Sequence, residues 1–246
     1  MGEEHSDPFD ILLRRLEPAH LPDAVRHAVR KLPAAVRDFR PNQDVVHEGG
    51  PSTHCCIVLT GWVGCYQMLE GRRQIVAIHI PGDTPDLQSL HLPEPDFGMQ
   101  TMTVASMAFI PHTDIQRLIA AFPFLGAVLW RETLLVAAIH RAWMTGLGRR
   151  NSLGRLAHLF CELYLRLEAI GLADAYSMPM PLRQYDLADA LGQTTVHINR
   201  TLQDMRRAGL IELEGRQLMI KDWQRLVAAA EFNPLYLHLS PKVAEL

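Results

Sequence analysis

The hydrophobic pattern changes its period along the chain. From Val36 to His112, short apolar runs alternate with turn residues, and glycines at 49, 50, 61, 71 and 82 separate them at hairpin-like intervals. Before and after this region, apolar residues recur three or four positions apart, which is typical of one face of a helix. The pattern predicts an α+β protein with short helices over 9–32, an all-β sandwich or roll, and a largely helical remainder.

A glycine turn joins two predicted helices near residue 192. The first helix is expected over 184–191, and Gly192 permits a tight turn because glycine adopts positive φ without a steric penalty. Thr194 can cap the second helix by accepting a hydrogen bond from a backbone N–H group. The apolar residues of the second helix fall on one stripe: Ile198, Leu202 and Met205. A short two-strand hairpin is expected to follow, ending at Ile220.

The outward face of the second helix carries polar groups that suit base edges and phosphates. Two helices joined by a glycine turn, with an outward polar second helix and a hairpin behind it, predict a winged helix-turn-helix that binds double-stranded DNA. The predicted DNA contacts are Thr194, Thr195, Val196, His197, Asn199, Arg200, Gln203, Arg206, Arg207 and, on the wing, Arg216. A surface helix pair with solvated polar residues stays an open alternative.

A long helix is expected over about 124–147, after a break at Pro123. Its apolar positions cover two adjacent sides, so the helix needs two neighbours. One neighbour is the chain's own β module, and the other is most simply the same helix of a second subunit. The predicted dimerisation residues are Val128, Leu135, Ala138, Ile139 and Ala142. A helix buried wholly within its own domain is the alternative.

Composition narrows the class of protein further. The net charge is −3, and between residues 183 and 225 seven Lys and Arg stand against six Asp and Glu, so local geometry must supply any attraction to phosphate. The chain shows no signal-peptide pattern and no apolar run long enough to cross a bilayer. The four cysteines lack metal-knuckle spacing. We therefore expect a cytoplasmic protein without membrane association.

Several strings in the order of the chain resemble the Crp/Fnr family of bacterial transcription regulators. They are DLADALG, TTVHINRTL and RRAGLI in the second half, and EGG (48–50), VLTGWV (58–63) and PGD (81–83) upstream. The resemblance implies a β-roll sensor domain like a cyclic-nucleotide-binding domain over 1–149, including the dimerisation helix. It implies a winged helix-turn-helix domain with a C-terminal helix and tail over 150–246. It also implies a homodimer on a palindromic operator, with RNA polymerase as a further partner.

The same resemblance singles out one base-reading residue. Only Arg200 matches the family's base-reading arginine, whereas Thr195, Val196 and His197 depart from the early positions of the family's second helix. The usual family half-site is therefore not expected here.

The family's effector pocket holds a cyclic nucleotide through a Gly-Glu pair and an Arg-Ser/Thr pair. The equivalent positions here read Asp86-Leu87 and Gln100-Thr101, and no Lys or Arg occurs between Arg73 and Arg117. A buried phosphate needs a cation or several N–H donors to offset its desolvation. We therefore expect a degenerate pocket and no control by cyclic AMP.

Cofactor and enzyme patterns are weak. An iron–sulfur cluster needs four thiolates, and residues 1–54 contain no cysteine. A haem, metal or thiol-based redox site at His54, Cys55 and Cys56 stays open, although free cysteines commonly serve as small core residues. No histidine lies in a known catalytic motif, so no enzyme and no cofactor are expected. The alternatives are a redox-sensing regulator and an interaction protein with the same fold that does not read DNA.

Overall fold

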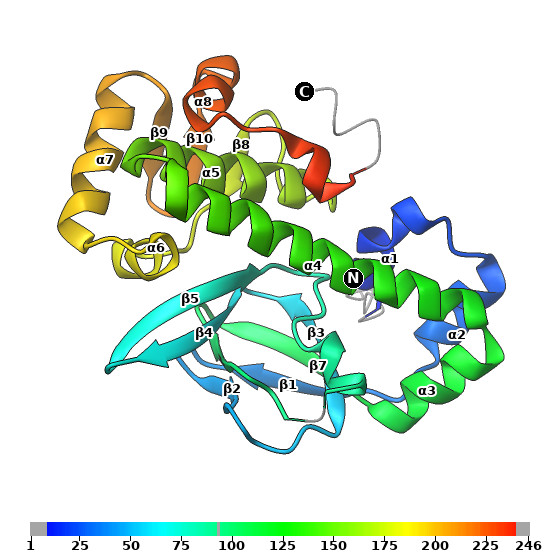
Figure 1. Ribbon diagram of the computed structural model, residues 1–246. Coiled ribbons are helices and arrows are strands. Elements are labelled where there is room, and N and C mark those ends of the chain that lie inside the picture. The colour runs from blue at the N-terminus through cyan, green and yellow to red at the C-terminus, as the bar shows by residue number, and fades with distance from the viewer. Residues whose placement is uncertain (1–8, 93, 240–246) are drawn as a thin grey trace, which may run out of the picture. The chain divides into compact units, whose positions relative to one another are not determined.

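The computed structural model describes residues 9–92 and 94–239 (Figure 1). The last part of the expected tail, residues 240–246, lies outside the described residues. Contacts divide the chain into one unit of residues 1–67 and 78–134 and another of residues 68–77 and 135–246. The predicted boundary between 149 and 150 falls at the end of the long helix α4 (Pro123–Arg149), which both units share.

Two antiparallel sheets form the β module, as the turn spacing predicts. One has the strand order β1-β7-β3 and the other β2-β6-β4-β5. The strands are β1 (Ala35–Phe39), β2 (Asp44–Val46), β3 (His54–Thr60), β4 (Val63–Leu69), β5 (Arg72–His79), β6 (Gly98–Thr101) and β7 (Ala105–Pro111). The expected β-roll is therefore confirmed.

Short helices of the first unit pack in one core with strands β3 and β7. They are α1 (Asp10–Arg15), η1 (Glu17–Ala19), α2 (Asp23–Arg30), η2 (Leu87–Leu90) and α3 (His112–Ala121). One continuous core joins Phe9 and Leu13 near α1, Ile57 of β3, Ile110 of β7 and Val128 of α4. Residues 55–58 are buried at every position, which explains their unbroken apolar run, since both faces of β3 are covered.

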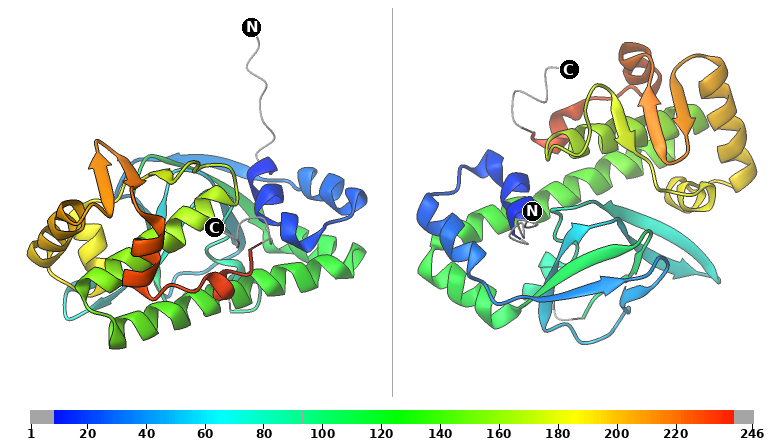
Figure 2. Two further views of the ribbon diagram at one scale, coloured as in Figure 1. Left: turned by 90° about the horizontal axis from the view of Figure 1, so that it is seen from above. Right: turned by 180° about the vertical axis from the view of Figure 1, so that it is seen from behind.

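The second half folds as a winged helix-turn-helix. Its elements are α5 (Ser152–Glu168), β8 (Ser177–Pro179), α6 (Gln184–Leu191), α7 (Thr195–Arg207), β9 (Ile211–Glu214), β10 (Gln217–Ile220), α8 (Trp223–Ala230) and η3 (Pro234–Leu237). Helix α5 is buried along most of its length and forms the centre of this domain. The wing has three strands in the order β8-β10-β9, not the predicted two, because residues 177–179 pair with β10 (Figure 2, orange and yellow strands).

Candidate nucleic-acid interface

The turn between α6 and α7 has the expected local chemistry. Gly192 ends α6 in the left-handed conformation at φ +59°. Thr194 is extended, and its Oγ1 accepts a hydrogen bond from the backbone N–H of His197 at 3.3 Å. Ile198 and Met205 are fully buried, so the apolar stripe fixes which face of α7 is left outside.

The outward face of α7 and the wing holds the residues predicted to contact DNA. Asn199 is half-buried, and the others are exposed: Thr194, Thr195, Val196, His197, Arg200, Gln203, Arg206, Arg207 and Arg216. Their contact with DNA stays a prediction, but none of them is withdrawn into the core.

Hydrogen bonds between side chains fix the orientation of Asn199. Its Nδ2 donates to Oε1 of Gln184 at 3.2 Å, and its Oδ1 accepts from Nε2 of Gln203 at 3.0 Å. These bonds link the first residue of α6 to two of the predicted DNA contacts on α7. An amide held in this way presents a defined edge, which lowers the entropy lost when it binds a base.

Some of the basic residues of this domain form ion pairs with nearby acids, and others do not. Arg207 pairs with Asp204 on the same helix. Glu212 of the wing strand β9 pairs with Lys221, which follows β10. Within 9–92 and 94–239, the side chains of Arg200, Arg206 and Arg216 form no ion pair. These three guanidinium groups are therefore the ones best placed to meet phosphates or bases.

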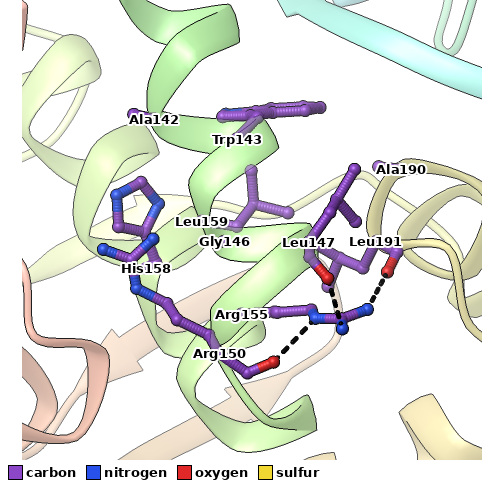
Figure 3. Close-up of a pocket in the computed structure, with 10 residues that line it drawn as sticks. All are labelled: Ala142, Trp143, Gly146, Leu147, Arg150, Arg155, His158, Leu159, Ala190 and Leu191. Atoms are coloured by element: carbon purple, nitrogen blue, oxygen red, sulfur yellow. Dashed lines mark hydrogen bonds between the residues drawn. The ribbon is translucent and has the colours of Figure 1, made fainter.

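Two arginines that sequence reasoning passed over join the ends of three helices. Arg155 donates to the carbonyl oxygens of Leu147 at 2.8 Å and Leu191 at 3.1 Å (Figure 3). Arg150 donates through Nε to the carbonyl oxygen of Ala230 at 2.7 Å. Cations at helix C-termini satisfy carbonyl groups that have no partner within their helix and favour the helix dipole.

A small cavity of about 20 Å³ lies beside these arginines, with His158 and Trp143 in its wall (Figure 3). Its size suits about one water molecule.

A buried polar cluster holds the C-terminal turn in place. Glu162 of α5 is fully buried and accepts hydrogen bonds from Trp143 Nε1 at 3.1 Å, Tyr236 Oη at 2.7 Å and Arg166 Nη1 at 3.2 Å. Burial raises the pKa of Glu162, and these three donors oppose that rise. Residues 234–237 therefore pack on α5, a role that the semi-apolar tail sequence alone does not reveal.

The four residues predicted for the degenerate effector pocket lie in different surroundings, and their joint role stays a prediction. A cavity of about 180 Å³ in the first unit is lined by Asp86 but not by the other three. Leu87 is buried in the core, and Gln100 Nε2 donates to Oδ1 of Asp44. Thr101 Oγ1 donates to the carbonyl oxygen of Arg40 and accepts from the N–H of Gln43.

The charged side chains that line the cavity are all acidic: Asp86, Glu94 and Asp96. A cyclic phosphate in this cavity would face carboxylates and no cation among its described lining residues.

The three β-roll thiols are packed as core residues. Burial raises the pKa of Cys55 to about 12 and raises the pKa of Cys56 and Cys65 well above the ordinary value. Such thiols stay protonated near neutral pH, so they are poor nucleophiles. His54 is exposed and its Nδ1 bonds to Thr53 Oγ1, and the described residues contain no group of three or more His, Cys, Asp or Glu suited to a metal.

The residues predicted for dimerisation lie mostly inside their own chain, and their role in an interface stays a prediction. Ala142 is half-buried, and the other four are at most 7% exposed because their own chain already covers them: Val128, Leu135, Ala138 and Ile139. Three exposed large apolar side chains of α4 lie on another side: Trp130 is 69%, Leu134 56% and Met144 67% exposed. Their spacing of 4 and 10 residues puts them on one stripe of the helix.

Comparison with known proteins agrees with this architecture. The family model described as a Crp-like helix-turn-helix domain matches residues 154–229, and the cyclic nucleotide-binding domain model matches residues 36–122. No helix among the described residues is long and apolar enough to span a membrane.

Relatives and solved structures match over most of the chain. The nitrogen fixation regulation protein FixK of Bradyrhizobium diazoefficiens is 30% identical over 78% of this chain and 80% of its own. The transcriptional activator protein FnrL of Cereibacter sphaeroides is 27% identical over 79% of each chain. The structure of FixK2 from Bradyrhizobium japonicum superposes with a TM-score of 0.74 at 27% identity, covering 80% of this chain and 98% of that one. The chain belongs to the Crp/Fnr family of transcription regulators and carries that family's helix-turn-helix DNA-binding domain.

Proposed function

We propose that the protein is a homodimer that binds a palindromic operator through α7 of each subunit and is not controlled by cyclic nucleotides. It acts as a binding protein of the cytoplasm, with RNA polymerase as its further partner, and not as an enzyme. The observation that carries the proposal is the outward face of α7. On that face the polar side chains other than the half-buried Asn199 are exposed, and Arg200 and Arg206 form no ion pair within the described part of the chain.

The roles of the arginines follow from their positions. In a helix-turn-helix, the early residues of the second helix reach base edges in the major groove, and later residues meet the backbone. Arg200 can donate two hydrogen bonds to O6 and N7 of guanine, and Asn199 suits N6 and N7 of adenine. Arg206, Arg207 and Arg216 lie later on the helix or on the wing, so they contact phosphates.

The dimer is proposed to form through the exposed stripe of α4. Trp130, Leu134 and Met144 are each more than half exposed. Contact of apolar surface with water is unfavourable, and a second copy of the same helix would bury it. A two-fold axis parallel to this helix would pair each stripe with itself and set two copies of α7 on one palindrome.

Selection of bound sequences from random double-stranded DNA tests the proposal. We expect a palindromic consensus with two half-sites about one helical turn apart. Sedimentation of the same protein at micromolar concentration should give the mass of a dimer. A chain that sediments as a monomer, or that selects no sequence, would contradict the proposal.

A further inference from the structure

Arg73 of β5 makes two ion pairs with α6. Its Nη2 lies 3.1 Å from Oδ1 of Asp186, and its Nε lies 2.8 Å from Oδ2 of Asp189. The Arg73 side chain is 21% exposed and that of Asp186 only 4%, so this contact is far drier than an ordinary surface pair. Arg73 lies in the segment 68–77, which belongs by its contacts to the second unit.

The same segment reaches both ends of α6. Asp186 also accepts a hydrogen bond through Oδ2 from the backbone N–H of Arg183, which caps the start of the helix at 3.0 Å. Gln74 donates through Nε2 to the carbonyl oxygen of Ala190, near the end of the helix, at 3.3 Å. Burial raises the pKa of Asp186, while the N–H of Arg183 and the charge of Arg73 favour the ionised carboxylate.

A short series of contacts leads from Arg73 to the predicted base contacts. Asp186 fixes the start of α6, and the next residue after the cap, Gln184, accepts the hydrogen bond that orients Asn199. Helix α6 also packs directly on α7. A shift in the start of α6 would therefore turn the Asn199 amide away from its present direction.

We propose that Arg73 is a positioning residue for DNA recognition: by holding Asp186 and Asp189, it sets the start of α6 and through it the base-reading face of α7. This inference rests on the proposed function, because it concerns how accurately α7 is presented to DNA. A residue that positions a reading helix affects specific binding more than non-specific binding, since the latter depends on charge alone.

The test compares variants of the full-length protein on its selected operator and on unrelated DNA. Arg73→Ala should lower the operator affinity by about 10-fold or more while changing the affinity for unrelated DNA by less than about 3-fold. Arg72→Ala is the matched control, since it removes the same charge from the adjacent, exposed position. It should change neither affinity by more than about 2-fold.

Exchange of the charges guards against loss of folding. Arg73→Glu combined with Asp189→Arg places the cation on α6, where it can pair with the carboxylate introduced on β5 as well as with Asp186, so operator binding should recover relative to Arg73→Glu alone. Thermal unfolding of each variant shows whether it is folded. A folded double variant that binds the operator no better than Arg73→Glu would overturn the proposal.

The outcomes separate this inference from the proposed function. If the wild-type protein selects no operator, the proposed function fails and the inference falls with it. If the wild type selects an operator but Arg73→Ala behaves as Arg72→Ala does, only the positioning role is overturned. If Arg73→Ala weakens operator and unrelated DNA by the same factor, Arg73 acts merely as a charge and the positioning role is likewise overturned.

Discussion

Replacing Asp86 with Asn tests the cost of a buried carboxylate beside the acidic cavity. Asp86 is 4% exposed, and its Oδ1 accepts a hydrogen bond from the backbone N–H of Cys56 at 2.8 Å. Burial raises its pKa from the ordinary 3.8 to about 6, although the Cys56 N–H favours the charged form. Asn has nearly the same shape, and its Oδ1 can accept the same hydrogen bond without carrying a charge.

The pKa difference gives the magnitude and the sign. A shift from 3.8 to about 6 corresponds to about 3 kcal/mol between the two protonation states. Because the folded pKa lies above the unfolded one, the folded state binds the proton more tightly. The stabilisation by that proton is complete below pH 3.8 and is lost as the pH rises through about 6. Asp86→Asn should therefore be more stable than the wild type above pH 6, by up to about 3 kcal/mol.

Urea unfolding between about pH 4 and about pH 8 measures this difference. The stability gap between Asp86→Asn and the wild type should widen steadily with pH, and water in the adjacent cavity would reduce its size. Asp96→Asn is the control, because Asp96 lines the same cavity but is exposed, and it should show no such widening. A gap that does not change with pH, or a variant less stable than the wild type at the alkaline end of this range, would refute the reasoning.

Three further predictions concern DNA, assembly and the effector. Arg200→Ala should cost about 1–3 kcal/mol of binding free energy at the preferred operator and relax the base preference at one position per half-site. Arg216→Ala should weaken binding to all sequences alike and lower the slope of log affinity against log salt concentration by about one. Sequence selection and salt titrations distinguish the two variants, and an unchanged consensus for Arg200→Ala would make Arg200 a phosphate contact. Leu134→Glu should produce monomers in sedimentation without lowering the stability of the chain, while Leu135→Glu should destabilise folding itself because that side chain is buried; a dimeric Leu134→Glu protein would contradict the proposed stripe. Calorimetry should detect no micromolar binding of cyclic AMP or cyclic GMP, and binding at that level would show that a cation reaches the cavity from elsewhere.

Sequence patterns predict best the features that local chemistry determines. The bounds of α6, the turn at Gly192 and the cap by Thr194 agree with the structure because each depends on residues within one or two helical turns. The antiparallel roll is predictable for a similar reason, since its glycine turns recur at short intervals.

Features that depend on distant parts of the chain escape such patterns. The α4 sequence shows two apolar sides, but periodicity does not say which side the chain itself covers: Leu135 is buried within the chain, whereas Leu134 is exposed. The four expected pocket positions depend on resemblance alone, and hydrogen bonds with Arg40, Gln43 and Asp44 draw two of them elsewhere. The third strand of the wing is too short to stand out as an apolar run.

The near-zero charge of the helix-turn-helix segment becomes intelligible once five of its six acidic groups are assigned to partners. Asp204, Glu212 and Asp222 pair with basic residues close in sequence, and Asp186 and Asp189 pair with Arg73 from far upstream. An acid that is already paired opposes an approaching phosphate less than an isolated one does, because the field of a close ion pair falls off quickly with distance. Three arginines of α7 and the wing form no such pair within the described residues, those at positions 200, 206 and 216, and they then dominate the field near α7 and the wing. A domain can therefore be nearly neutral in sum and still attract DNA at one face, so its net charge is a poor guide to whether it binds nucleic acid.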